Sequence, residues 1–407
     1  MKLLLALAII ATTPDYQILL GPFSAAAEVS ENTPRTFIGL TNTDECDNAL
    51  DYYEALVAKG VDAELDIYPA GCEDELSDAL ARWKGDKQKR IPSEIKGIRQ
   101  PDEILRLYPE GQDSDKGLPG AEGPLYSNSK SDDVWIKGCG FIHPGGGDKA
   151  QIEIYYPEKP NGQVIILCPG GGYNQLNALA CGTLGGNWLS ERGFTAVVLK
   201  YRMPWGNPEI PLQDVQNVIR YCKHMGSEWG TNQVGVLGGS AGGHLAALAS
   251  TLYKDDSTKP DFAILLYPLI IAAGEPKNPG CNSELFGESP SEEILERFSP
   301  NLNVTKDTPP TFIACNRHDW ILECQHFTQY QKALMHNNVP SEFHAYAEGY
   351  HGWAFLSDEY CAYLDKNNQN VYMLADPEGS HYEDQMGGCR EDFERSLLRF
   401  LKNLRYE

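Results

Sequence analysis

Short apolar runs alternate along this chain with longer stretches in which apolar residues recur every three or four positions. A continuous apolar run is typical of a buried parallel strand, and one occupies residues 163–168. Further strands are predicted at residues 195–201, 234–237, 262–267, 311–315 and 342–346. Helical spacing predicts helices in most of the intervals, at residues 187–192, 211–225, 244–250, 323–337 and 390–404. Residues 150–156 alternate instead, which predicts a strand with one polar face. This order of elements predicts an α/β fold with a mostly parallel, doubly wound sheet and helices on both faces.

The chain also contains an internal repeat. Four early segments match four late ones in the same order and with similar spacing: 14–22 with 260–268, 33–38 with 308–313, 52–56 with 330–334, and 63–68 with 341–346. Residues 1–90 are therefore predicted to be a degenerate C-terminal half of a second copy of the main domain, beginning after its nucleophile. Asp44 falls opposite Asp319, but Glu73 stands where the main copy has His351. We expect this half-domain to be catalytically silent.

The first residues allow a second interpretation. A lysine followed by the apolar run Leu3–Ile10 is typical of a signal peptide, with Ala25–Ala27 as a cleavage site, whereas the repeat makes Leu3–Ile10 a core helix. The chain would be secreted or periplasmic if residues 1–27 are a leader, and cytoplasmic otherwise. Residues 91–133 are polar and rich in Gly, Pro, Asp and Lys, which predicts a linker or surface wrap. Residues 134–407 then form the main domain.

Composition narrows the classes of partner. The chain has 407 residues, 34 Lys and Arg against 57 Asp and Glu, and a formal charge of −23. Such a charge argues against nucleic acid and against an anionic membrane surface as partners. The 11 cysteines are irregularly spaced without a C-x-x-C pair, so no zinc site or disulfide framework is predicted, although Cys361 or Cys389 leaves room for a bridge. We expect no metal or cofactor.

The strongest chemical signal is the G-x-S-x-G motif at Gly238–Gly242. A buried strand precedes it and a helix rich in small residues follows it, which is the context of a nucleophile elbow. The glycines let strand and helix approach closely around a serine on a strained turn. The motif therefore predicts Ser240 as a nucleophile.

A serine nucleophile needs a base, and the base needs an acid that orients it. In the chain order serine, acid, histidine, Asp319 follows one predicted strand end and His351 follows the last one. Asp319 is alternatively a helix cap, with Glu348 or His318 as competitors in its role. His351 is alternatively a packed loop histidine. His244, four residues after the serine, is expected to pack behind the elbow.

Gly170–Gly172 follows another buried strand and precedes the elbow. A tetrahedral intermediate needs two or more preorganised N–H donors, and glycines allow the backbone to turn such groups inward. We therefore expect an oxyanion hole made by the backbone N–H groups of Gly171, Gly172 and Ala241. No G-K-[ST] follows, so this is not a phosphate loop.

These motifs together resemble the α/β-hydrolase family, and within it the bacterial sugar-ester esterases related to acetylxylan and feruloyl esterases. The resemblance begins near residue 105 and reaches residue 406. Its markers are Cys168–Tyr173, Leu199–Arg202, Pro211–Asp214, Gly238–His244, Phe298–Pro300, Thr308–Thr311 and Tyr350–Gly352. It implies the α/β-hydrolase fold, Ser240, His351 and Asp319 as triad, an acyl-enzyme and no metal. An acidic insertion at residues 361–388 and the half-domain in front depart from the family pattern.

The resulting expectation is a serine carboxylic ester hydrolase. By resemblance, its substrate is a small-molecule or polysaccharide ester, best an acetylated plant polysaccharide. Aromatic residues that could stack on sugar faces, or equally belong to the core, are Tyr173, Trp205, Trp320 and Trp353. An oligopeptidase and a non-catalytic binding protein remain as alternatives, and the sequence leaves the oligomeric state open.

Overall fold

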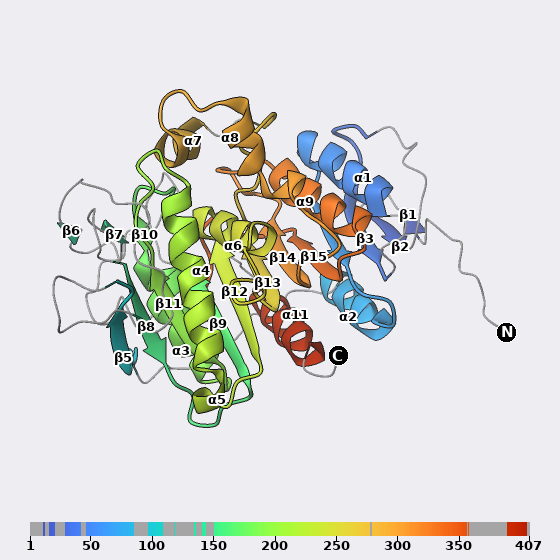
Figure 1. The fold of residues 1–407 in the computed structure, drawn as a ribbon. Coiled ribbons are helices and arrows are strands. Elements are labelled where there is room, and N and C mark those ends of the chain that lie inside the picture. The colour runs from blue at the N-terminus through green and yellow to red at the C-terminus, as the bar shows by residue number, and fades with distance from the viewer. Residues whose placement is uncertain are drawn as a thin grey trace, which may run out of the picture.

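A single large sheet runs through the molecule in the computed structural model (Figure 1). The model describes residues 11–12, 16–20, 29–41, 46–84, 97–108, 118, 134–135, 141–143, 150–276, 279–355, 357 and 389–404. Within these residues the sheet has 12 strands in the order β1-β2-β3-β4-β15-β14-β13-β12-β9-β11-β8-β5, where the first edge strand, β1, is Ala11–Thr12. The predicted leader or core helix at residues 3–10 and the insertion at 361–388 lie outside the described residues.

The parallel heart of the sheet is built from the predicted apolar runs. Its strands are β9 (Gln163–Cys168), β11 (Thr195–Lys200), β12 (Gln233–Gly239), β13 (Phe262–Leu266), β14 (Thr311–Asn316) and β15 (Ser341–Tyr346). Neighbours among them pair in parallel. β8 (Gln151–Tyr155) then pairs antiparallel with β11. Because parallel strands end at a common edge, the segments that follow them meet there.

Helices cover both faces of this sheet, as the sequence pattern predicts. They are α1 (Cys46–Ala58), α2 (Glu73–Lys84), α3 (Leu184–Ser190), α4 (Glu209–His224), α5 (Gly226–Trp229), α6 (Ala241–Thr251), α7 (Pro279–Phe286), α8 (Glu292–Arg297), α9 (Gln325–His336) and α11 (Arg390–Asn403). In Figure 1, α4, α6, α9 and α1 lie over the face turned to the viewer. None of the helices in the described residues is long and apolar enough to cross a membrane.

The N-terminal segment extends the same sheet. Its strands β2 (Tyr16–Leu20), β3 (Arg35–Leu40) and β4 (Ala63–Ile67) are parallel and adjacent, in the order of their repeat counterparts β13, β14 and β15. Alternate side chains serve two cores: Ile18 and Phe37 pack with α2, while Leu19 and Ile38 belong to the main core. The segment thus has the layered construction expected if it is a copy of residues 260–346.

The two segments that the predicted repeat matches meet through equivalent strands. β4 and β15 pair antiparallel, with Phe343 opposite Ile67, His344 opposite Asp66, and Ala345 opposite Leu65. The repeat matches residues 63–68 with residues 341–346. The pair Phe343–Ile67 is therefore the counterpart of the pair Ala345–Leu65, and the pair His344–Asp66 is its own counterpart. A local pseudo-two-fold axis therefore passes through this pair, and α1 packs on its counterpart α9. The half-domain is docked on the main domain as an intramolecular partner.

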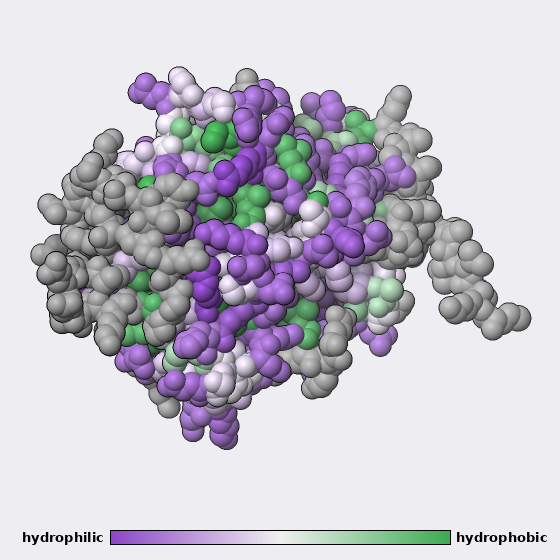
Figure 2. Space-filling model, viewed as in Figure 1, coloured by the Kyte–Doolittle hydropathy of each residue, from purple (hydrophilic) through white to green (hydrophobic). Residues whose placement is uncertain are grey.

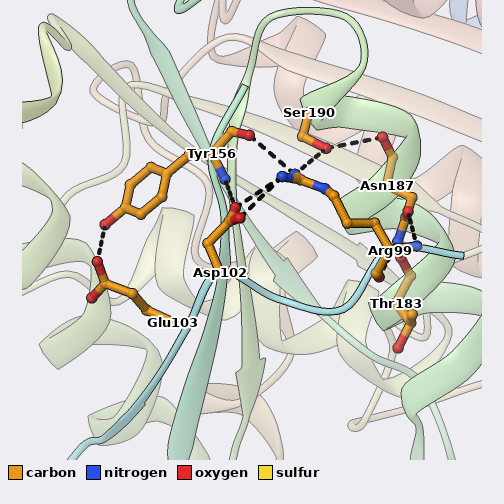
Figure 3. Close-up of polar contacts among 7 residues, drawn as sticks. All are labelled: Arg99, Asp102, Glu103, Tyr156, Thr183, Asn187 and Ser190. Atoms are coloured by element: carbon orange, nitrogen blue, oxygen red, sulfur yellow. Dashed lines mark hydrogen bonds and ion pairs between the residues drawn. The ribbon is translucent and has the colours of Figure 1, made fainter. Parts of the chain in front are cut away.

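The segment predicted as linker or surface wrap contributes the edge strand β5 (Glu103–Arg106), which pairs with β8. Figure 3 shows how the chain before β5 is attached. The Arg99 guanidinium donates to Asp102, to the Tyr156 carbonyl and to the Ser190 hydroxyl, and the Arg99 backbone exchanges two hydrogen bonds with the Asn187 side chain. The part of the sheet that belongs to the main domain therefore begins at β5 and not at residue 134, close to the start of the family resemblance.

A buried ion pair stabilises the chain just beyond β11. The guanidinium of Arg202 donates to the carboxylate of Asp214 at 2.6 Å, and both side chains are almost fully buried. The Tyr108 hydroxyl donates to the same carboxylate at 2.6 Å. On the surface, by contrast, hydrophilic side chains cover most of the described part of the face seen in Figure 2.

Candidate active site

The site is organised by the sharp turn between β12 and α6. Ser240 lies in this turn with φ 56° and ψ −124°, a strained conformation for a residue with a side chain. A Cβ on Gly238 would overlap the carbonyl oxygen of Gly242, and one on Gly242 would overlap that of Cys168. The glycines of the motif are therefore required by close backbone packing, and the turn presents Ser240 at the carboxyl edge of the sheet.

The structure brings Ser240, Asp319 and His351 together from three separate loops. His351 Nε2 lies 2.8 Å from Ser240 Oγ, and His351 Nδ1 lies 2.7 Å from Asp319 Oδ2. Asp319 Oδ1 accepts hydrogen bonds from the backbone N–H groups of Ile321 and Leu322 at 3.0 and 2.9 Å. The carboxylate is thereby fixed on one side and free to orient the imidazole on the other. This arrangement allows His351 to take a proton from the serine hydroxyl.

Side chains around His351 hold its loop in place. The Tyr267 ring packs edge-on against the imidazole with 4.8 Å between ring centroids, and its hydroxyl accepts from the Ala354 N–H at 3.1 Å. Asn316 at the end of β14 donates to the Glu348 carbonyl and accepts from the Trp353 indole. Sequence reasoning did not single out Tyr267 or Asn316. Each lies at or just after the end of a strand, and that position is the sequence signal by which they could have been found.

Gly171 and Gly172, two of the three predicted oxyanion residues, line a cavity together with Ser240 and His351. It has a volume of about 220 Å³ and is lined by Gly170, Gly171, Gly172, Asn174, Gln175, Asn177, Cys181, Ser240, Tyr267, Ile321, His351 and Gly352. The carbonyls of Gly170 and Gly171 accept hydrogen bonds from Asn177 and Gln175, so their loop is turned back on itself. Ala241 is the first residue of α6, where backbone N–H groups lack an acceptor within the helix. The oxyanion role of Gly171, Gly172 and Ala241 stays a prediction from the sequence, and the first two lie beside Ser240 in the cavity wall.

His244 and His318, the other two histidines considered near the elbow and the acid, lie in different surroundings from His351. His244 is fully buried, its Nε2 lies 2.8 Å from the Phe298 carbonyl, and its Nδ1 lies 2.7 Å from the Tyr173 hydroxyl. Burial lowers the pKa of His244 to about 4, so it is a neutral packing residue behind the elbow. His318 stacks near Tyr350, and burial and the neighbouring arginine lower its pKa.

The aromatic candidates divide clearly by exposure. Tyr173 and Trp353 are fully buried and belong to the core. Trp205 and Trp320 are 38% and 58% exposed, and Tyr350, which the sequence analysis did not consider, is 55% exposed. Trp320 directly follows Asp319 and Tyr350 directly precedes His351, so both exposed rings belong to the loops that carry the acid and the base.

The described part of the chain gives little support for metal-dependent or thiol-based chemistry. There, no group of three or more His, Cys, Asp and Glu side chains is arranged to hold a metal ion. Cys168 and Cys315 are buried free thiols, and burial raises the pKa of both. Cys389 is buried, and Cys361 lies outside the described residues.

Comparison with known proteins finds esterases among those that resemble this chain. A family model described as BD-FAE matches residues 152–265. An acetylxylan esterase of Xylanibacter ruminicola is 30% identical over 213 residues, which cover 51% of this chain and 44% of that protein. Endo-1,4-beta-xylanase B of Butyrivibrio fibrisolvens is 27% identical and covers 65% of this chain and 44% of its own length. The chain thus spans less than half the length of these two curated relatives.

Two solved structures resemble most of the chain. An acetyl ester-xyloside bifunctional hydrolase from Caldicellulosiruptor lactoaceticus is 25% identical with a TM-score of 0.52, covering 68% of this chain and 100% of that one. A sugar hydrolase from Lactococcus lactis is 25% identical with a TM-score of 0.50, covering 67% and 99%. The chain has the α/β-hydrolase fold. The relatives support an esterase and favour neither a peptidase nor a non-catalytic binding protein.

Proposed function

We propose that this chain is a serine-dependent carboxylic ester hydrolase that removes short acyl groups from sugar esters. The observation that carries the proposal is the continuous hydrogen-bond chain from Asp319 through His351 to Ser240. Hydrolase relatives, including an acetylxylan esterase, support the same chemistry.

The proposed reaction has two halves. Ser240 Oγ attacks the ester carbonyl carbon while His351 Nε2 takes its proton, and the carbonyl oxygen becomes an oxyanion bound by the N–H groups of Gly171, Gly172 and Ala241. His351 then gives the proton to the departing alcohol, which leaves an acyl-serine. Water attacks this ester with His351 again as base, releasing the carboxylic acid and restoring the serine.

The size and rim of the cavity support a short acyl group on a sugar. A volume of about 220 Å³ is below the range of roughly 300–1,000 Å³ that encloses drug-sized ligands, so the acyl pocket suits acetyl better than a long chain. Trp320, on the loop of the catalytic acid, offers an exposed ring face of the kind on which sugars stack. The formal charge of −23 also disfavours a polyanionic substrate.

Hydrolysis of p-nitrophenyl acetate, butyrate and octanoate tests the chemistry, together with acetate release from acetylated xylan, by wild type and Ser240→Ala. We expect a preference for acetate and activity that disappears in the variant. Activity that survives in Ser240→Ala would contradict the proposed nucleophile. Faster cleavage of p-nitroanilides than of acetyl esters would instead support a peptidase.

The sugar assignment needs its own test. Trp320→Ala should raise KM for acetylated xylo-oligosaccharides severalfold and leave p-nitrophenyl acetate hydrolysis unchanged. Ile104→Ala is the matched control, because Ile104 is equally exposed but lies on the edge strand β5 at the far end of the sheet. Equal KM values for Trp320→Ala and Ile104→Ala would remove the stacking argument.

A further inference from the structure

We propose that the N-terminal half-domain is a positioning element for the acid and the base of the triad, acting through Arg317 and Glu64. The inference rests on the proposed function, because it assigns a role in the same reaction. A half-domain that only covered the edge of β15 would contribute stability and leave the chemistry untouched.

The acid side of the site is tied to the half-domain by Arg317. This residue lies two positions before Asp319, and its side chain points to the turn between α1 and β4. Its Nη1 donates to the carbonyls of Gly60 at 3.3 Å and Val61 at 2.9 Å. Its Nε lies 3.4 Å from an Asp62 carboxylate oxygen, an ion pair without hydrogen-bond geometry. The Nη1 and Nε groups of Arg317 therefore take their partners from residues 60–62 of the half-domain.

The same arginine is fixed from within the main domain. Its backbone N–H donates to the Tyr346 carbonyl at 2.9 Å, which joins the ends of β14 and β15. Its Nη2 lies 2.6 Å from His318 Nε2. Backbone and side chain of Arg317 together connect the acid loop, the end of the last strand and the half-domain turn. A shift of that turn would move the peptide that carries Asp319.

The base side is tied by Glu64 on β4. Its Oε2 accepts a long hydrogen bond, 3.4 Å, from the N–H of Ala347, the residue with which the His351 loop begins. Glu64 is 4% exposed, so this contact is shielded from water. Arg82 of α2 lies 3.9 Å from its other oxygen. The half-domain thus contacts the loops of both the acid and the base within five residues, 60–64.

This double attachment has a kinetic consequence. Displacing a catalytic group by about 1 Å can cost about a hundredfold in rate. Releasing the acid loop from its support should therefore lower the reactivity of Ser240 without changing the substrate pocket. We expect Arg317→Met, which keeps the apolar stem and removes the donors, to lower kcat for p-nitrophenyl acetate roughly fivefold to a hundredfold with KM within about twofold.

A matched control separates positioning from docking. Lys332 of α9 contacts Asp51 at 2.5 Å and Glu54 at 3.4 Å on α1, so it bridges the same two copies without touching either catalytic loop. Lys332→Met should leave kcat within about twofold of wild type, whatever it does to the melting temperature. Arg317→Lys, which retains the charge and a donor, should recover part of the rate.

The experiment compares these full-length variants by kcat, KM, melting temperature and the rate of Ser240 labelling by a fluorophosphonate. Slower turnover and slower labelling in Arg317→Met alone support the inference. Rates near wild type in Arg317→Met, or losses that match Lys332→Met, would overturn it. Should Arg317→Met fail to fold, Glu64→Ala, which removes the acceptor of the Ala347 N–H on the base side, is compared by the same measurements with the same outcomes. Failure of the proposed function is distinguishable, because wild type would then resist labelling or Ser240→Ala would remain active.

Discussion

Replacing Asp319 by asparagine should place the proton on the wrong nitrogen of His351. Asp319 Oδ1 accepts from two backbone N–H groups, those of Ile321 and Leu322, so an asparagine must put its amide oxygen there. Its NH₂ group then takes the place of Oδ2, 2.7 Å from His351 Nδ1. Two donors cannot face each other, so Nδ1 becomes the acceptor and Nε2 carries the proton. Nε2 then donates toward Ser240 Oγ and can no longer receive its proton.

The expected loss is large and specific to turnover. A wrong tautomer in a serine triad costs about 10⁴ in kcat, which corresponds to about 5.4 kcal/mol at 1.36 kcal/mol for each factor of ten. Asp319→Asn keeps both backbone hydrogen bonds, so the melting temperature should change little. The assay is kcat for p-nitrophenyl acetate with the fluorophosphonate labelling rate, each measured well below the melting temperature.

Asp319→Ala provides the informative comparison. It leaves the N–H groups of Ile321 and Leu322 without their acceptor, which should cost about 1–3 kcal/mol in unfolding free energy. It does not force the wrong tautomer, so it should retain more activity than Asp319→Asn. An Asp319→Asn enzyme within about tenfold of wild type, or one faster than a folded Asp319→Ala enzyme, would refute the tautomer argument.

Three further predictions concern the oxyanion loop, the buried ion pair and the interface. Gly171→Ala adds a Cβ that overlaps the Gln175 carbonyl at φ 136°, so displaced donors should lower kcat about 10²–10³-fold with secondary structure unchanged by circular dichroism. Asp214→Ala leaves the Arg202 guanidinium buried without its carboxylate, and urea unfolding should show a loss of about 3–5 kcal/mol. Burial and a neighbouring carboxylate raise the pKa of Glu64 from 4.5 to about 8, so folding takes up a proton. The stabilisation from protonated Glu64 is complete below pH 4.5 and is lost as the pH rises through 8, so the melting temperature should fall over this range. In Glu64→Gln this fall should be smaller.

Most of the parallel strands were predictable because their sequences are largely apolar, although β15 includes Glu342 and His344. β9 was predicted with its observed bounds, and the elbow strand and helix differ only by a few residues at their ends. The meeting of Ser240, Asp319 and His351 follows from the same rule, since each comes after a parallel strand and such strands end at one edge. Short-range pattern was sufficient here because each strand is buried on both faces.

Contacts between the two copies were beyond that kind of reasoning. The repeat indicated what residues 63–68 resemble, but strand direction at a junction depends on which edges are left open. An arginine beside a catalytic acid carries no sequence mark that tells whether it faces water or a distant turn. The contact of Arg317 with the half-domain could not be predicted for this reason, and neither could the difference in exposure between Trp320 and Trp353.

The pair on the pseudo-two-fold axis explains why the half-domain, and not a second chain, suits the edge of β15. In an exact repeat the residue on the axis would face its own copy, and two β15 strands would place His344 against His344. The divergence to Asp66 converts this self-pair into a buried hydrogen bond of 2.8 Å between Nδ1 and a carboxylate. Burial alone would lower the pKa of His344, but hydrogen bonds to Asp66 and Glu342 raise it. The interface therefore favours the unlike strand and disfavours the like one, which is how specificity between near-identical partners is obtained.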